Sequence, residues 1–125
     1  PFMQWTQLGG PRGEVVRVWS MVDDGALVNA IDEKTYRKSE CRLGALRPSR
    51  KWLRMANGIV TPSLGVWRGM FTIAGISCQT DLEVFNGGSA WSLLIGKPLL
   101  ESLCVIHDYG NDTIHIPTGN ESESV

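Results

Sequence analysis

The chain lacks several features that mark whole classes of protein. Its 125 residues carry a net charge of −1, from 12 basic and 13 acidic residues. A binding surface for nucleic acid or for an anionic membrane is therefore not expected. The longest apolar runs are about five residues, far short of the roughly 20 that a membrane-spanning helix needs. Residues 1–10 also lack the basic start and apolar middle of a secretory signal.

Cysteine is scarce and follows no pattern. Cys41, Cys78 and Cys104 are odd in number and show no Cys-x-x-Cys spacing, so a disulfide framework is not expected. His107 and His115 do not repeat with the cysteines in a zinc-ligand pattern. We expect no metal, no organic cofactor and a reducing, intracellular compartment.

The length supports one domain with a single core. Residues 1–13 are rich in glycine and proline, and we expect them to form an N-terminal arm or an edge segment. Residues 14–117 are expected to form the folded domain, and residues 118–125 a disordered C-terminal tail. The chain does not begin with methionine, and we expect Pro1 to be a processed end.

Most of the expected elements are short strands. Residues 14–22 are dense in valine, tryptophan and methionine, which favours a buried strand. Asp32 is placed to cap a short helix that ends near Gly44. The pair Asn57 and Gly58 is a strong hairpin signal, because both residues tolerate positive φ.

The second half of the chain continues this pattern. A hairpin around Ala74 and Gly75 joins strands at residues 67–73 and 76–85. In the second of these strands we expect Ser77, Gln79, Asp81 and Glu83 to share the polar face. A strand at residues 91–95, a helical turn at 98–103 and a last hairpin over 105–116 follow. The fold class is therefore mainly β, with one or two short helices.

Two adjacent acids stand where the first buried strand ends. Asp23 and Asp24 follow Met21 and Val22 and precede Gly25. Peptide hydrolysis by paired carboxylates needs an acid on a rigid turn after a buried strand, followed by glycine where the backbone passes close to its partner. Two such carboxylates about 3 Å apart share one proton, so one activates water while the other polarises the carbonyl. Asp-x-Gly also occurs in plain turns, so the wider context must decide.

That context resembles the retropepsins, the aspartic proteases of retroviruses and long-terminal-repeat retrotransposons. Their half-site motif is Asp-Thr/Ser-Gly-Ala, and three of its four positions match at Asp23-Asp24-Gly25-Ala26. Their second signature, apolar residues and then glycine before a helix, is similar to Leu94-Ile95-Gly96. Their flap hairpin resembles the segment formed by Met55, Ala56, Asn57, Gly58 and Ile59. The resemblance covers residues 15–116 and is closest in character to fungal retrotransposon polyprotein proteases.

The resemblance implies a closed β-barrel half-lobe with a flap, forming a homodimer. Asp23 of each subunit would form the catalytic dyad, with Asp24, Gly25 and Ala26 in the active-site loop. The substrate would be an extended peptide or polyprotein segment, and the compartment the cytoplasm or virus-like particles. Candidate pocket walls, each of which core packing would explain equally well, are Leu27, Val60, Trp91 and Ile95.

One position departs from the family pattern. The family has threonine or serine after the catalytic aspartate, and its hydroxyl both donates and accepts hydrogen bonds, whereas Asp24 when ionised only accepts. Three outcomes stay open. In the first, Asp24 is protonated in the dimer, so that acid favours dimerisation and activity. In the second, a local donor such as Asn29 offsets the missing hydroxyl. In the third, the domain is a catalytically silent retropepsin fold that binds peptides or mediates dimerisation.

Two further alternatives come from outside this scheme. Asp108, in a second Asp-x-Gly, is a rival that would supply the partner acid within one chain, although a plain hairpin turn follows it. In the other alternative, the chain is an unrelated small β-barrel in which Asp23 and Asp24 only form a turn. A stable monomer with Asp23 far from any second acid would favour that last reading.

Overall fold

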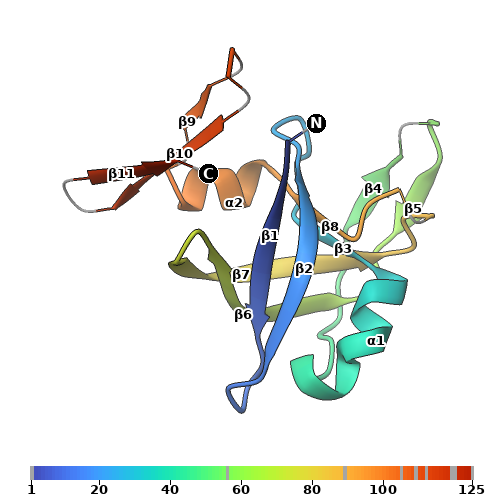
Figure 1. Cartoon of the computed structure of the whole chain (residues 1–125). Coiled ribbons are helices and arrows are strands. Elements are labelled where there is room, and N and C mark those ends of the chain that lie inside the picture. The colour runs from blue at the N-terminus through green and yellow to red at the C-terminus, as the bar shows by residue number, and fades with distance from the viewer. Residues whose placement is uncertain are drawn as a thin grey trace.

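The computed structural model describes residues 2–55, 57–88, 90–104, 106–108, 110–111, 113–118 and 121–124. Six strands form a closed barrel in the order β1-β2-β8-β3-β7-β6 (Figure 1). Two short helices accompany them, so the expected mainly β barrel is confirmed. The barrel elements and helices are β1 (Phe2–Gly9), β2 (Val15–Val22), β3 (Ala30–Asp32), α1 (Glu33–Leu43), β6 (Val66–Ile73), β7 (Ile76–Phe85), β8 (Leu93–Ile95) and α2 (Lys97–Ser102).

The barrel closes through pairings between segments far apart in the sequence. Strand β8 runs parallel to β2, with Val22 opposite Ile95, and antiparallel to β3. Strand β3 runs parallel to the end of β7, with Ala30 opposite Glu83. These pairings bring the ends of β2 and β8, which carry the two sequence signatures, side by side.

The N-terminal segment differs from the arm that the sequence predicted. Phe2–Gly9 is strand β1, which pairs along its whole length with β2 and also with β6. Leu8 is completely buried in the core, and the hydroxyl of Thr6 lies 2.8 Å from that of Ser20 inside the barrel. Most of the glycine and proline, namely Gly10, Pro11 and Gly13, lies in the turn at residues 10–13 that joins β1 to β2.

Helix α1 begins and ends where its capping residues predict. The Asp32 carboxylate accepts a hydrogen bond from the Lys34 amide, and the Gly44 amide donates to the Glu40 carbonyl. Ile31 and Tyr36, the apolar residues on either side of the cap, occupy hydrophobic-staple positions and are both buried in the main core. The helix therefore follows from local signals, and its capping residue sits at the end of a barrel strand.

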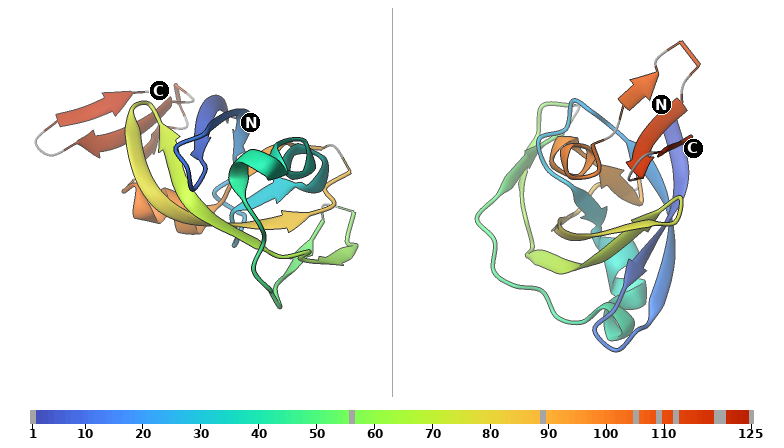
Figure 2. Two further views of the ribbon diagram at one scale, coloured as in Figure 1. Left: turned by 90° about the horizontal axis from the view of Figure 1, so that it is seen from below. Right: turned by 90° about the vertical axis from the view of Figure 1, so that its left-hand side faces the viewer.

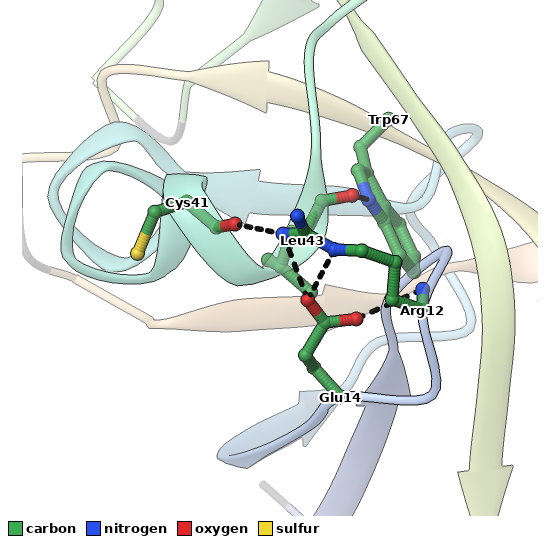
Figure 3. Close-up of polar contacts among 5 residues, drawn as sticks. All are labelled: Arg12, Glu14, Cys41, Leu43 and Trp67. Atoms are coloured by element: carbon green, nitrogen blue, oxygen red, sulfur yellow. Dashed lines mark hydrogen bonds and ion pairs between the residues drawn. The ribbon is translucent and has the colours of Figure 1, made fainter.

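Side chains from two distant segments satisfy carbonyls at the end of α1 (Figure 3). Arg12, in the β1–β2 turn, donates to the Cys41 carbonyl at 3.1 Å and is paired with Glu14. The indole of Trp67, which is 1% exposed, donates to the Leu43 carbonyl at 2.8 Å. Because the last carbonyls of a helix have no partner within the helix, these bonds fasten α1 to the barrel.

Strand β7 contains one exception to the expected alternation. Ser77, Gln79 and Asp81 are exposed as predicted, but Glu83 is 4% exposed. It lies where β3 joins β7, and its carboxylate accepts a hydrogen bond from the Ser49 hydroxyl. The exception arises because the segment between α1 and the next strand covers this end of β7.

Two smaller sheets project from different sides of the barrel (Figure 2). Strands β4 (Trp52–Arg54) and β5 (Val60–Pro62) form one hairpin. Strands β9 (Ile106–Asp108), β10 (Thr113–Thr118) and β11 (Glu121–Ser124) form the other sheet. Strand β11 pairs with β10, so this part of the expected disordered tail is instead a strand. Within the described part of the chain, no helix is long and apolar enough to cross a membrane.

Candidate active site

Asp23 occupies a fixed turn directly after β2. Its amide donates to the Ile95 carbonyl at 2.9 Å, and its carbonyl accepts from the Ala26 amide at 3.1 Å. The carboxylate oxygen Oδ1 accepts from the Gly25 amide at 2.9 Å. The side chain is exposed, so the loop holds a solvent-accessible carboxylate at a defined place.

The two sequence signatures meet at a close backbone contact. The Lys97 amide donates to the Ala26 carbonyl at 2.8 Å. A Cβ atom on Gly96 would lie 2.0 Å from the Val28 carbonyl oxygen, so the contact requires glycine. The start of α2 is therefore packed directly against the loop that carries Asp23.

Asn29 joins the same two segments and was not predicted in this role. Its Oδ1 accepts from the amides of Gly96 and Leu99, both at 3.1 Å, and its Nδ2 donates to the Asp81 carbonyl at 3.5 Å. The residue is 8% exposed. The sequence suggests Asn29 as a donor that offsets Asp24. In the structure its Oδ1 instead holds the start of α2, and its Nδ2 is bonded to Asp81. An asparagine four residues after Gly25 gives no signal of such a long-range bond.

The β4–β5 hairpin is the candidate flap. The Met55 amide donates to the Ile59 carbonyl at 2.7 Å, and Asn57 Oδ1 accepts from the Ile59 amide at 3.0 Å. Gly58 has a φ of 86°, which explains the glycine at this turn. Ala56, which the sequence also placed in the flap, lies outside the described residues.

A groove of about 1040 Å³ runs between the Asp23 loop and this hairpin. Met55, Asn57 and Ile59 line one side of it, and Asp23, Gly25 and Ala26 line the other. Asp23 and Arg54 are the charged residues among its described lining. The remaining lining is largely apolar and includes Met21, Leu27, Val28, Trp52, Leu53, Trp91 and Leu94.

The structure separates the four expected pocket residues into two pairs. Leu27, which is 77% exposed, and Trp91 line the groove. Val60 is exposed but is not among the lining residues, and Ile95 is completely buried in the barrel core. For Ile95 the reason is that successive side chains of β8 point to opposite faces of the strand. Ile95 faces the interior, whereas its neighbour Leu94 faces the groove.

The other acids that the sequence singled out lie apart from the groove lining. Asp24 is exposed next to Asp23 but does not line the groove. Asp108, the rival within the chain, belongs to β9 in the C-terminal sheet, and Tyr109 beside it lies outside the described residues. Asp23 is thus the one carboxylate that the described residues contribute to the groove.

A second, polar pocket of about 410 Å³ is lined mainly by residues of β7 and α2. Asn29, Lys51 and Glu83 line it together with the ion pair of Arg68 and Asp81. The hydrogen bond from Arg68 lowers the pKa of the Asp81 carboxyl below its ordinary value. Across the described residues, no three histidine, cysteine or acidic side chains gather in a way that would hold a metal ion.

Comparison with known proteins identifies the fold. No protein-family profile matches the chain, and no curated protein sequence does. Among solved structures, the crystal structure of the retroviral protease-like domain of Ddi1 from Leishmania major matches with a TM-score of 0.63 and 19% identity. The alignment covers 93% of this chain and 88% of that one. The chain therefore has a retropepsin-like fold.

Proposed function

We propose that this chain is an aspartic endopeptidase that acts as a homodimer, with Asp23 of each subunit in the dyad. The observation that supports this most directly is the position of Asp23. It is an exposed carboxylate on a hydrogen-bonded turn, in an apolar groove that the β4–β5 hairpin borders. Because the described groove contains one carboxylate, a two-acid mechanism requires a second copy of the chain.

The mechanism follows from the chemistry of two close carboxylates. About 3 Å apart, they share one proton, because both cannot ionise together. The ionised Asp23 takes a proton from water as the water oxygen attacks the peptide carbonyl carbon. The protonated Asp23 of the partner donates to the carbonyl oxygen, which bears the developing negative charge. The proton that Asp23 took from water then passes to the amide nitrogen. The C–N bond breaks as a hydroxyl of the intermediate returns a proton to the partner's Asp23, giving a carboxylic acid and an amine.

The groove favours an extended, apolar substrate. Leu27, Trp91, Leu53 and Leu94 present apolar surface beside Asp23, which suits apolar residues on either side of the bond that is cut. The hairpin offers backbone groups to an extended peptide, which would bind as an added strand. We propose a segment of a polyprotein of the retrotransposon type as the natural substrate, with the protein in the cytoplasm or in virus-like particles.

Cleavage of a mixed peptide library at several pH values between about 3.5 and 7.5 tests the proposal. The parent chain is expected to cut between apolar residues. Asp23→Asn keeps the Oδ1 acceptor for the Gly25 amide and so should fold normally, yet it is expected to lose at least 1,000-fold in kcat/KM. A folded, dimeric parent that cuts nothing at any pH, or an Asp23→Asn variant that cuts equally well, would contradict the proposal.

Asp24 supports a second candidate, a catalytically silent domain that binds peptides or mediates dimerisation. In a dimer, Asp24 adds two carboxylates close to the two of the dyad, and their repulsion disfavours association at neutral pH. We expect acid to favour the dimer, because protonated Asp24 can donate the hydrogen bond that a threonine hydroxyl would donate.

Asp24→Thr is expected to tighten the dimer at least tenfold at about pH 7.5 and to remove most of its acid dependence. Sedimentation equilibrium at about pH 4.5 and pH 7.5 measures both effects. Glu40→Gln, on α1, removes the same charge and serves as the matched control. If Asp24→Thr restores cleavage to an inactive parent, the silent-domain candidate is correct; an equally tight parent dimer at both pH values refutes the role given to Asp24.

A further inference from the structure

The outer face of β1 and β2 carries an apolar ladder that the proposed chemistry does not use. The two strands run side by side across the barrel (Figure 1). Their register places each outward residue of β1 directly opposite one of β2. Trp5 faces Trp19, with ring centroids 5.1 Å apart. The adjacent rung pairs Met3 with Met21, and the rungs on the other side are Gln7 with Arg17 and Gly9 with Val15.

Folding alone does not account for this face. Cross-strand aromatic pairing stabilises a hairpin, by about 0.2–1 kcal/mol. Even so, Trp5 remains 48% exposed and Trp19 44% exposed, with Val15 and Met70 also open to solvent. Large aromatic side chains left exposed in a contiguous stripe are characteristic of binding surfaces.

The ladder is continuous with the groove. Met21, which stands opposite Met3 in the ladder, also lines the groove. It packs with the groove-side cluster that contains Leu94. Asp23 lies two residues after Met21 in the chain. From Met21 to Arg17 is four residues of strand, or about 13 Å. A peptide leaving the groove at Met21 would therefore cross the tryptophan rung and reach Arg17 within about four extended residues.

The positive charge of Arg17 indicates which kind of side chain this face binds. Arg17 is the one charged residue of β1 and β2, and its guanidinium carbon sits 4.6 Å from the Trp5 ring centroid. Among the described residues no carboxylate lies within ion-pair distance of it. A two-fold contact of this face with itself would bring two Arg17 side chains together without a carboxylate from β1 or β2, so such a symmetric contact is disfavoured here.

We infer that the ladder is an exosite for the substrate polypeptide, binding an extended segment that lies outside the groove and carries an acidic side chain. Arg17 pairs with the acid, and Trp5 and Trp19 pack against apolar or proline residues between the acid and the groove. The inference rests on the proposed peptide groove and adds a specificity element to it.

The test uses binding rather than turnover. A displayed library of random 16-residue peptides is selected on the full Asp23→Asn chain and, in parallel, on Asp23→Asn with Arg17→Glu. We expect the first selection to enrich an acidic residue about four positions outside an apolar core, and the second to lose it. For a selected peptide measured by fluorescence anisotropy, Arg17→Glu is expected to raise Kd at least tenfold, and replacing the peptide acid by lysine should restore binding to that variant.

Matched variants separate the alternatives. Lys38→Glu reverses an exposed charge on α1 and is expected to change Kd less than twofold, whereas Trp5→Thr with Trp19→Thr should weaken binding as Arg17→Glu does. No selected peptide, no acid enrichment, or equal effects of Arg17→Glu and Lys38→Glu would overturn the inference. A variant with both tryptophans replaced that loses self-association but keeps peptide binding would also overturn it. Peptides that bind through Arg17 but are not cut by the parent would refute the protease proposal alone.

Discussion

Replacing Gly96 with alanine is expected to destabilise the fold by about 3 kcal/mol and to displace the Asp23 loop. The new Cβ would lie 2.0 Å from the Val28 carbonyl oxygen and 3.1 Å from that of Ala26. Both atoms belong to backbone, which cannot rotate away as a side chain would. The start of α2 must then move from the loop, breaking the Lys97–Ala26 bond and the two bonds that Asn29 accepts. Urea unfolding followed by tryptophan fluorescence gives the change in free energy.

Gly9→Ala is the matched control for this substitution. Its Cβ would meet the Met70 Cβ at 3.4 Å, an ordinary contact, and we expect a change below about 1 kcal/mol. Peptide cleavage by Gly96→Ala, measured under conditions where it is still folded, should also fall at least tenfold because Asp23 loses its fixed position. Equal stability of Gly96→Ala and the parent would show that the close approach of the two segments does not constrain the site.

Asp32→Ala is expected to cost about 3 kcal/mol, because one buried carboxylate holds two segments. Its Oδ2 accepts from the Lys34 amide at the start of α1, and its Oδ1 accepts from the Gly87 amide at 2.8 Å. Loss of the carboxylate removes the helix cap and leaves the Gly87 amide buried without its partner. Gly87 lines the groove beside Trp91, so the groove wall should loosen as well.

The comparison that isolates this effect is Glu33→Ala, which removes a carboxylate from the first turn of the same helix. Glu33 is only partly buried and forms a 3.7 Å ion pair with Arg37, so its loss should cost at most about 0.5 kcal/mol. Thermal unfolding by circular dichroism ranks the two variants. Asp32→Asn, which keeps an oxygen acceptor, should fall between them, and an Asp32→Ala variant as stable as Glu33→Ala would refute the double role.

Local chemistry explains which parts of the fold the sequence predicted. The cap at Asp32, the glycine at Gly44 and the turn at Ala74 and Gly75 each depend on neighbouring residues. Strand β1 was missed because its outer face mixes methionine, tryptophan and glutamine and a glycine-rich turn follows it. Its place in the barrel depends on pairing with β2 and β6, which no local pattern specifies.

The candidate site divides in the same way. The signature around Asp23 and the hairpin around Gly58 are contiguous in sequence, so both could be recognised. Asn29 bonds to Gly96, and Asp32 bonds to Gly87 in addition to capping α1. Both bonds join residues more than 50 positions apart, and nothing in the sequence marks either of them. Ile95 was wrongly expected in the groove because the sequence does not specify which face of β8 points into the core. That face is set by the two strands that pair with β8.

The central position of β8 has a consequence for when the protein acquires its site. Three residues of this strand join β2 to β3, and the Ile95 carbonyl holds the Asp23 amide, although Asp23 is made far earlier in synthesis. A nascent chain that ends before β8 has the aspartate but neither a closed barrel nor a fixed carboxylate. Closing so long a loop is entropically costly and comes late in folding. The ribosome must release residues through α2 before the groove is assembled, so Asp23 acquires its fixed position only after most of the chain has been synthesised.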